Sequence, residues 1–486
     1  MKFLFHRLPA LALLALLLPL GGAVRPRAAA GFLTSAAASP TQSGNQPDPQ
    51  VLAQFGLYNN PTLQRLIDAK GQQMNKVSDR PGDYGFTIVD SPVINAFATP
   101  QGHVYFTRGI MAHFNNEAQF AGVLGHELGH ITARHGQKQQ RNSTIAGIGM
   151  LLGSIAAPRL MQQVGGIAQQ GLGLLFLKYS RGDENEADGL GVKYSTKIGY
   201  DASQMADFFL TLQRNEQASG GGTTPTFLSS HPSSADRYTR VKGLAAQAKQ
   251  NANATTLAVN RNQYLRMIEG LPYGEDPRQG FVEGGVFYHP DLKFRFLVPA
   301  GWKSQNSPTD FKMAEPNGKA LLVFMGAPGN SLDEAAQAVA KGIGLQGGQA
   351  QKTTINGFPA MVFEGDQVQQ DESGQQAAGA HVLAQLIQDG RSIYAFIGLA
   401  APASFATYAR QFQGVAGSYA RLTDPNKLNR QSEKIRIKTA AHAMTLDQAL
   451  AANGIPAARR EEVAILNGMH RSDRLAAGTL YKVLGR

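Results

Sequence analysis

The sequence predicts an α+β protein: a mainly helical unit with a small sheet, then an α+β sandwich and a small C-terminal α/β module. Its 486 residues are enough for about two to four domains. Hydrophobic residues make up 43% and charged residues 17%, a composition typical of globular chains. Apolar residues recur at helical spacing between residues 115 and 135, whereas from residue 286 onward they alternate with polar ones. This change of period predicts the change from helices to strands.

The lack of cysteine and the even spread of basic residues exclude several kinds of site. The chain has no cysteine, which excludes a disulfide scaffold, a cysteine nucleophile and a thiolate metal site. Histidine, aspartate and glutamate are therefore the only strong metal ligands. The net charge of +11 is spread along the chain rather than gathered in a block, so we expect no nucleic-acid partner.

The N-terminus has the layout of a secretory signal peptide, which we assign to residues 1–30. Lys2 and Arg7 precede an apolar run over residues 8–20, which is too short to span a bilayer comfortably. An uncleaved N-terminal anchor is the alternative, and the pattern does not choose one cleavage site. Residues 31–50 are small, polar and proline-bearing, which predicts a linker. Either interpretation predicts export from the cytosol.

The elements of the first unit, residues 51–250, follow from caps and periodicity. Asn60 and Pro61 predict the start of a helix that runs to about residue 75. Short strands are expected at residues 86–90 and 104–107, on either side of a turn. A long helix begins at Asn115 or Asn116 and runs to about His135, with Gly136 as its stop. In the glycine-rich apolar stretch 144–177, the longest uninterrupted apolar run, residues 145–157, is too short to cross a membrane. The stretch can rest on a membrane as a peripheral contact, form a mobile flap or form buried helices.

The long helix contains the sequence His126-Glu127-Leu128-Gly129-His130. Residues four apart lie on one face of a helix, so both imidazoles can meet one ion while Glu127 lies beside it. In zinc hydrolases such a carboxylate takes the proton of the attacking water. We therefore expect one Zn²⁺ per chain, held by His126 and His130, with Glu127 as the general base.

The third ligand is not decided by spacing. The longer motif that supplies a third histidine is excluded because Ala133 and Gly136 stand at its required positions. His135 is then expected to pack beside the site rather than to bind the ion. The densest acidic cluster opens a helix at about residue 181, and Asp183, Glu184, Glu186 and Asp188 all stay open as candidates.

Several segments together resemble the HtpX/BepA-like zinc metallopeptidases, which are related to the CaaX prenyl proteases. The segments occur in order between residues 51 and about 245 and read N-A-F-A-T-P-x-G, T-R-G, V-L-G-H-E-L-G-H, S-R-x-x-E-x-E-A-D-x-x-G and S-H-P-x-x-x-x-R. The resemblance implies a zincin-type protease domain of the soluble periplasmic branch. It also implies that Glu186 is the third ligand and that Asp188 orients a ligand histidine.

Chemistry and the same resemblance suggest roles for His231 and for the strand at residues 95–98. A histidine in a loop near the metal can donate to the oxyanion that forms during hydrolysis. In periplasmic relatives a similar histidine can instead occupy the water position and hold the enzyme off. Arg237 is either a loop-anchoring ion pair or an anion contact. The resemblance also implies that residues 95–98 form an exposed edge to which an extended substrate adds as a strand.

The rest of the chain carries no catalytic pattern. Residues 251–285 are expected to be a connector. Residues 286–422 resemble the PsbP/Mog1-type α+β sandwich through the segment F-x-F-x-V-P-x-G-W. Residues 433–486 resemble LysM-type cell-wall modules but lack their usual Gly-Asp-Thr entry, so a structural cap is an equal alternative to glycan binding.

The function we expect is that of a periplasmic zinc endopeptidase acting on misfolded or unassembled envelope proteins. Peptidoglycan and the outer-membrane assembly machinery are further candidate partners. The alternative is a chaperone-like or cell-wall-tethered binding protein whose metal site is latent and gated by His231. Hydrolysis of peptidoglycan cross-links is a third candidate and rests on the C-terminal resemblance alone.

Overall fold

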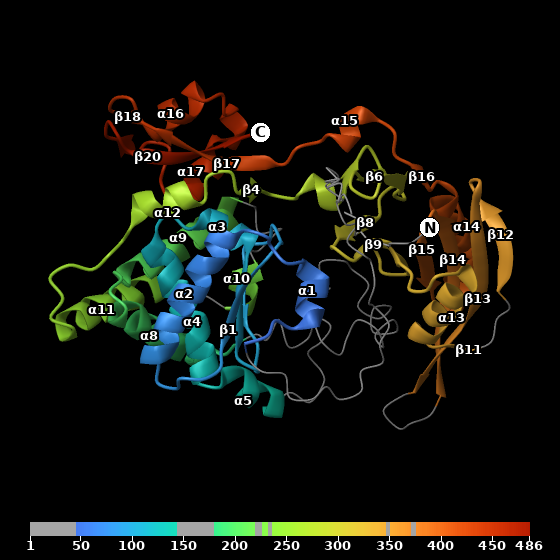
Figure 1. Ribbon diagram of the computed structural model, residues 1–486, viewed down its shortest axis with the longest axis horizontal. Helices are drawn as coiled ribbons and strands as arrows, with labels where there is room; N and C mark the ends of the chain where they lie inside the picture. The colour runs from blue at the N-terminus through green and yellow to red at the C-terminus, as the bar shows by residue number, and fades with distance from the viewer. Residues whose placement is uncertain (1–44, 143–178, 219–225, 232–235, 347–349, 371–375) are drawn as a thin grey trace, which may run out of the picture.

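The computed structural model describes residues 45–142, 179–218, 226–231, 236–346, 350–370 and 376–486. Helices and several sheets confirm the α+β class. A helical unit and a β-rich sandwich stand side by side, and the C-terminal unit sits on the helical unit (Figure 1). The expected signal peptide and the stretch 144–177 lie outside the described residues. Within the part of the chain that is described, no helix is long and apolar enough to cross a membrane.

The helical unit is built around a small sheet in the order β1-β3-β2. β1 (Gly85–Val89) runs parallel to β3 (His103–Thr107), and β2 (Ala96–Ala98) pairs antiparallel with β3 at the edge. The helices of the unit are α1 (Pro49–Phe55), α2 (Pro61–Val77), α3 (Arg108–His113), α4 (Glu117–Thr132), α5 (His135–Asn142), α8 (Arg181–Lys197), α9 (Ser203–Ala218), α10 (Thr226–Ser230), α11 (Arg237–Asn251) and α12 (Arg261–Met267).

Helix starts agree with the predicted caps, whereas one helix end does not. Asn60 caps α2 and the Oδ1 of Asn116 accepts from Gln119 N–H at 2.8 Å at the start of α4. The expected end of the long helix at His135 and Gly136 is wrong. α4 ends at Thr132, and Arg134 adopts a left-handed conformation with φ 61° from which α5 begins. The left-handed residue at this turn is therefore Arg134 and not the expected glycine.

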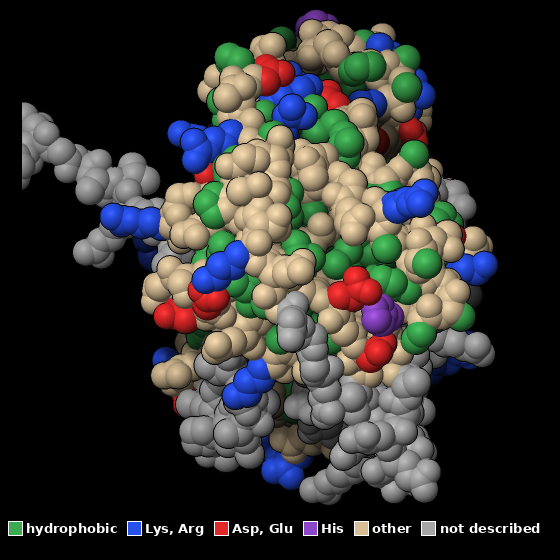
Figure 2. All heavy atoms as spheres, turned by 90° about the vertical axis from the view of Figure 1, so that its right-hand side faces the viewer, with side chains coloured by type: hydrophobic (Ala, Val, Ile, Leu, Met, Phe, Trp, Pro, Cys, Tyr) green, Lys and Arg blue, Asp and Glu red, His purple; other side chains and the backbone are tan. Residues whose placement is uncertain are grey.

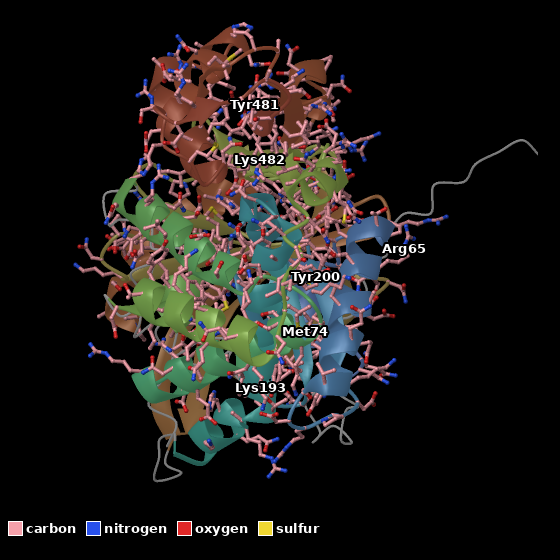
Figure 3. All side chains as sticks on the ribbon, turned by 90° about the vertical axis from the view of Figure 1, so that its left-hand side faces the viewer. Arg65, Met74, Lys193, Tyr200, Tyr481 and Lys482 are labelled. Atoms are coloured by element: carbon pink, nitrogen blue, oxygen red, sulfur yellow. The ribbon has the colours of Figure 1, made fainter. Side chains whose placement is uncertain are left out.

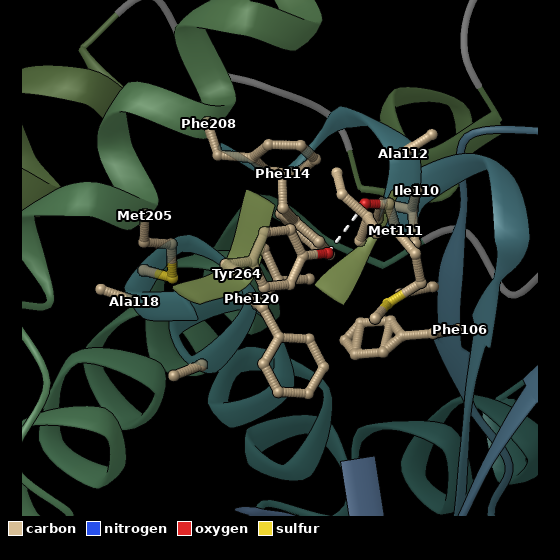
Figure 4. Close-up of a cluster of buried hydrophobic side chains, with 14 of the residues drawn as sticks. Phe106, Ile110, Met111, Ala112, Phe114, Ala118, Phe120, Met205, Phe208 and Tyr264 are labelled. Carbon is tan, nitrogen blue, oxygen red and sulfur yellow. Dashed lines mark hydrogen bonds between the residues drawn. The ribbon is translucent and has the colours of Figure 1, made fainter. Parts of the chain in front are cut away.

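The core of the helical unit is rich in aromatic residues (Figure 4). The rings of Phe106 and Phe120 lie 5.5 Å apart between the sheet and α4, and Phe114 packs against Phe208 of α9. The hydroxyl of Tyr264 on α12 donates to the carbonyl of Met111 at 2.8 Å. Because α12 contributes to this core, residues 251–285 are not the simple connector that the turn residues predict. Likewise α1 begins at Pro49, inside the expected linker.

The sandwich contains a large antiparallel sheet with helices on its two faces. Hydrophobic residues of α13 pack on one face, and those of α14 and a smaller sheet pack on the other. The large sheet has the order β11-β13-β14-β15-β10-β9-β8 with β12 beside β13, and the small one has the order β16-β7-β6-β5. The elements are η2 (Pro277–Gln279), β5 (Phe281–Glu283), β6 (Val286–His289), β7 (Phe294–Leu297), β8 (Lys303–Asn306), β9 (Asp310–Ala314), β10 (Ala320–Gly326), α13 (Leu332–Gly342), β11 (Leu345–Gln346), β12 (Gln351–Ile355), β13 (Phe358–Gln370), β14 (Gln376–Asp389), β15 (Ser392–Ala400), α14 (Pro402–Gly417) and β16 (Ala420–Arg421).

The strands β6, β7, β10, β13, β14 and β15 agree with the change to strands predicted from residue 286 onward. β5 precedes the predicted start of the sandwich at residue 286. The face of the sandwich in Figure 2 shows acidic, basic and hydrophobic side chains intermixed rather than gathered by kind.

The C-terminal unit shares a core with the helical unit. Its buried residues, among them Ile435, Leu466 and Leu484, belong to the same hydrophobic cluster as those of α2 and α4. β4 (Pro272–Tyr273) joins β17 and β20 in one sheet, so the chain before the sandwich pairs with the chain after it. The elements are α15 (Pro425–Leu428), β17 (Glu433–Thr439), β18 (Met444–Thr445), α16 (Leu446–Ala452), η3 (Ala457–Arg459), α17 (Arg460–Leu466), β19 (Arg474–Leu475) and β20 (Leu480–Gly485).

Candidate metal centre

Helix α4 places His126, Glu127 and His130 in the interior of the helical unit. All three are at most 1% exposed. The two imidazoles lie one turn apart, as helical spacing requires, and their Nε2 atoms are 3.1 Å from each other. Apolar residues on the rest of α4 bury the helix, so its polar groups meet in a place screened from water.

Glycines let helix α8 approach α4 closely at this point. A Cβ atom on Gly191 would lie 2.9 Å from the backbone nitrogen of His126, and one on Gly125 would lie 3.0 Å from the carbonyl oxygen of Gly191. Larger residues at these positions would force the helices apart. The close contact brings Glu184 and Asp188, which are four residues apart on α8, against the histidines of α4.

Four buried side chains converge on one point: His126, His130, Glu184 and His231. Nδ1 of His231 lies 2.9 Å from Oε1 of Glu184 and 3.3 Å from Nε2 of His126. Nε2 of His130 is 3.5 Å from the same glutamate oxygen. A tetrahedral zinc site with bonds of about 2.0–2.2 Å has ligand atoms about 3.3–3.5 Å apart. The corresponding distances here are 2.9 to 3.5 Å, so small shifts of the side chains would let these donors surround a zinc ion.

Further polar atoms at the site also fit a bound cation with water. Both carboxylate oxygens of Glu127 and Nε2 of His231 are buried and have no hydrogen-bond partner among the described residues. Buried polar atoms without partners are costly and uncommon. Burial raises the pKa of Glu127 above its ordinary value, against the opposing effects of His231 and His126. A carboxyl with a raised pKa is suited to accepting a proton near neutral pH.

The electrostatics of Glu184 differ from those of Glu127. Burial by itself raises the pKa of Glu184, but the neighbouring His231, His130 and His126 outweigh it and hold that pKa well below the ordinary value. Glu184 is therefore an anion in this environment, as a metal ligand must be.

Asp188 lies behind His126, and two arginines hold it there. Its Oδ1 is 3.0 Å from Nδ1 of His126. Arg237 donates to both carboxylate oxygens of Asp188, at 2.8 and 3.0 Å, and stacks on the ring of Phe209. Arg240 also pairs with Asp188 at 2.5 Å. Of the two roles considered for Arg237, the structure therefore shows the ion pair rather than the anion contact. Asp188 lies where a residue that orients His126 would lie.

Glu186, the ligand implied by the resemblance, is not part of this group. Its side chain is 54% exposed and its Oε2 lies 3.2 Å from Nε2 of His135. Glu184 takes the position expected for Glu186. The physical reason is the helical period: Glu184 and Asp188 share the face of α8 that meets α4, whereas Glu186 lies about 200° around the helix from Glu184. The four-residue spacing from Asp188 is the sequence signal that identifies Glu184.

Tyr179 is a site residue for which the sequence had no signal. Its ring stacks on His130 with a centroid distance of 3.8 Å and an interplanar angle of 23°. Together with His130 it lines a small, partly open cavity. The opposite wall is formed by the end of β2 and the following turn, at Ala98, Thr99 and Pro100. The cavity therefore connects the edge strand with the candidate metal centre.

The loop that carries His231 is attached to the same edge. The N–H of Phe227 on α10 donates to the carbonyl of Ile94 at 3.2 Å, just before β2. The N–H of His231 in turn donates to the carbonyl of Phe227 at 2.8 Å, and the two rings stack. The position of His231 at the centre thus depends on how α10 sits against the strand.

Comparison with known proteins shows what this region is similar to. The family Peptidase family M48 matches residues 59–245. Over 205 residues, covering 39% of this chain and 41% of the relative, the sequence is 32% identical to a putative beta-barrel assembly-enhancing protease of Vibrio cholerae. It is 29% identical to the metalloprotease YcaL of Escherichia coli, covering 43% of this chain and 76% of the relative. The chain spans less than half the length of the beta-barrel assembly-enhancing proteases that it matches.

Solved structures match part of the chain at low scores. A cyanobacterial PsbP from Synechocystis has 14% sequence identity and a TM-score of 0.23, covering 29% of this chain and 98% of that chain. The yeast Ran-binding protein Mog1p has 12% identity and a TM-score of 0.22, covering 28% of this chain and 94% of that one. The match of residues 59–245 to Peptidase family M48 and the similarity to metalloproteases support a metalloendopeptidase.

Proposed function

We propose that the protein is a zinc-dependent endopeptidase that hydrolyses peptide bonds of misfolded or unassembled cell-envelope proteins in the periplasm. The observation that carries this proposal is the buried convergence of His126, His130 and Glu184, with the carboxylate of Glu127 beside them. One zinc ion per chain is expected, since these are the donors of a single site.

The residues divide the chemistry between them. His126, His130 and Glu184 hold the ion, and Asp188 fixes the orientation of His126. Zinc bound there supplies Lewis acidity, which lowers the pKa of a water molecule toward neutrality. A carboxylate oxygen of Glu127 accepts the proton from the water that attacks the peptide carbonyl and later returns it to the amine that leaves. The surrounding apolar residues exclude other water and strengthen these interactions.

An extended substrate is expected to bind along β2. Residues 95–98 are at most 6% exposed, so this edge is not the exposed one that the resemblance implies, and binding requires the edge to be uncovered. Asn95 and Thr99 bond to β3 through their main chains, so the alternation of an antiparallel pair directs the main-chain groups of Ala96 and Ala98 away from β3. A peptide that pairs with this edge would pass the cavity beside His130. Such pairing reads main chain rather than side chains, which suits a protease for many unfolded sequences.

The cellular setting rests on the relatives and on the N-terminal pattern. Several relatives are called beta-barrel assembly-enhancing proteases, which supports substrates in the envelope and the assembly machinery of the outer membrane as a partner. The pattern of residues 1–30 supports export to the periplasm. For residues 433–486 we propose the role of a structural cap, because they share a core with the protease unit, with glycan binding as the alternative.

A second candidate function is a latent metal site in a chaperone-like or cell-wall-tethered binding protein. The position of His231 favours it, because Nδ1 of His231 completes a set of four protein donors. Structural zinc sites have four protein ligands, whereas catalytic ones leave a position for water. With zinc bound in this conformation, His231 would take the position of the water, which supports a latent site.

The test of the proposed function is zinc content and hydrolysis of unfolded casein by the exported chain, with Glu127→Gln beside the wild type. The enzyme reading predicts about one zinc in both proteins and loss of activity by about 10²–10⁴-fold in the variant. Removal of zinc with a chelator should abolish activity, and added zinc should restore it. Equal casein hydrolysis in Glu127→Gln, or no zinc in the wild type, would refute the proposal.

A further inference from the structure

His135 is a buried histidine that the proposed mechanism does not use. It is 1% exposed and begins α5, directly after the turn at Arg134. The left-handed conformation of Arg134, with φ 61°, folds the chain back so that His135 lies beside His130 rather than continuing along the helix. Nδ1 of His135 is 2.9 Å from Nδ1 of His130.

Metal binding determines which of these two nitrogens carries the proton. Nε2 of His130 faces Glu184 and His126, so it is the nitrogen that binds the ion and must be unprotonated. A neutral imidazole then carries its proton on Nδ1, which donates to His135. Nδ1 of His135 must therefore be an acceptor, and the proton of His135 must lie on Nε2.

Two carboxylates stand where that second proton needs an acceptor. Oε2 of Glu186 lies 3.2 Å from Nε2 of His135, and Oδ1 of Asp183 lies 3.5 Å from it. The other oxygen of Asp183 is engaged by the hydroxyl of Ser180 in the cap of α8, at 2.7 Å. Glu186 is thus nearer to His135 than Asp183 is, and Asp183 already accepts a hydrogen bond from Ser180.

The result is a continuous chain of donors and acceptors. It runs from the metal-binding nitrogen of His130 through His135 to Glu186. The opposite tautomer of His135 would donate to His130 and would force the proton of His130 onto Nε2, the nitrogen that has to bind the ion. Tyr179 stacks on one face of His130 and so restricts the ring further. Metal-ligand histidines commonly donate their second N–H to a carboxylate or carbonyl, and here a histidine is interposed.

We propose that His135 and Glu186 are positioning residues that preset the tautomer and orientation of His130 for zinc. This inference rests on the metal site of the proposed function and adds two residues that do not touch the ion. It gives Glu186 a role in the same site, at one remove from the metal. Removing the acceptor at either link should weaken zinc binding without removing a ligand, by about 10–100-fold.

The experiment measures zinc affinity of the full exported chain by competition with a chromophoric chelator. His135→Leu removes the acceptor for His130, whereas His135→Asn keeps an acceptor close to the position of Nδ1. Glu186→Ala removes the terminal acceptor, whereas Glu186→Gln keeps a carbonyl oxygen. Glu275→Gln, an exposed glutamate in the turn after β4, is the matched control.

We expect His135→Leu and Glu186→Ala to bind zinc at least about tenfold more weakly, and the Asn, Gln and control variants to stay within about threefold of wild type. The visible spectrum of the Co²⁺-loaded protein should change in the same two variants, since the orientation of a ligand ring changes. Wild-type affinity in Glu186→Ala would overturn the inference. Because Glu186 is exposed, Glu186→Ala should fold and tests the inference even if His135→Leu fails to fold. Absence of zinc binding in the wild type would instead refute the proposed function.

Discussion

At the scale of single residues, the chemistry of this site depends on which face of a helix each side chain occupies. Glu184 and Glu186 are the same residue type, two positions apart. One is 2% exposed and meets three histidines, whereas the other is largely exposed and pairs with His135. The position of His231 depends in the same way on its loop, which places the imidazole ring between Glu184 and Glu127.

Replacing His231 by alanine distinguishes the two roles of this histidine. If His231 occupies the water position, His231→Ala should retain zinc through its three other ligands and cleave casein at least about tenfold faster than wild type. If it stabilises the oxyanion instead, activity should fall by about 10²–10³-fold. His470→Ala, an exposed histidine near the C-terminus, is the control and should match wild type. A fall in activity with zinc retained would argue against gating.

At the scale of elements, the site is made by the contact of α4 with α8 and by the strand β2 beside it. The pair Gly125 and Gly191 sets the distance between the helices and hence the span of the donor set. β2 supplies the edge along which a substrate strand is expected, and the carbonyl of Ile94, just before β2, accepts a hydrogen bond from Phe227 of α10. The edge and the loop of His231 are therefore adjacent.

Substituting proline for Ala98 tests whether substrates pair with β2. The N–H of Ala98 is directed away from β3, so Ala98→Pro removes a donor to the substrate and leaves the pairing with β3 intact. We expect kcat/KM on casein to fall about tenfold, consistent with loss of one main-chain hydrogen bond, while zinc content stays unchanged. Ala98→Ser keeps the N–H and should be near wild type. Equal kinetics for the proline and serine variants would exclude strand addition at this residue.

At the scale of the whole molecule, the C-terminal unit packs as a structural part of the helical unit. The ammonium of Lys482 on β20 donates to the carbonyls of Ala112, Phe114 and Leu466, at 2.7 to 3.0 Å. Lys482 is fully buried and lies where the two units meet (Figure 3). The end of the chain thus stabilises the segment between α3 and α4, which leads into the helix of the metal centre.

Lys482→Met should therefore destabilise the helical unit as well as the C-terminal one. The substitution keeps the apolar stem but leaves buried carbonyls without donors, at a cost of about 2–4 kcal/mol in the free energy of unfolding. Chemical denaturation followed by tyrosine fluorescence would measure it. Lys438→Met, at an exposed position on β17, should change that free energy by less than about 0.5 kcal/mol. Similar values for the two variants would show that the buried lysine does not stabilise the interface.

A buried histidine at the same interface predicts how stability depends on pH. Burial lowers the pKa of His113 to about 4 from an ordinary value of 6.5. The unfolded chain therefore binds this proton more readily than the folded one, and the stability present above pH 6.5 is lost as the pH falls toward 4. The loss from this group is about 2 kcal/mol at pH 5.

Denaturation at pH 7 and pH 5 would measure the effect, with His113→Gln and His470→Gln compared with wild type. The change of unfolding free energy between the two pH values should shrink by about 2 kcal/mol in His113→Gln and stay unchanged in the control. An unchanged difference in His113→Gln would assign the acid sensitivity to other groups.

Local patterns in the sequence determined much of this protein. Periodicity and caps located α2, α4 and α8 and the main strands of the sandwich, because each depends on residues within a few positions of one another. The spacing of His126, Glu127 and His130 placed those three on one helix for the same reason. Elements that depend on distant partners were not predicted, since α12 and β4 lie in the expected connector. The end of α4 was also not predicted, because Arg134, rather than the expected Gly136, adopts the left-handed conformation after the helix.

The tertiary structure alone decided which further residues meet those three. Glu184 rather than Glu186 joins the histidines because two glycines let α8 press one of its faces against α4. Tyr179, His135 and His231 come from separate turns and loops, and no local spacing relates them to the helix they surround. A helical motif is specified by its own backbone geometry, whereas a complete metal site requires the packing of several elements, whose approach depends on the whole core.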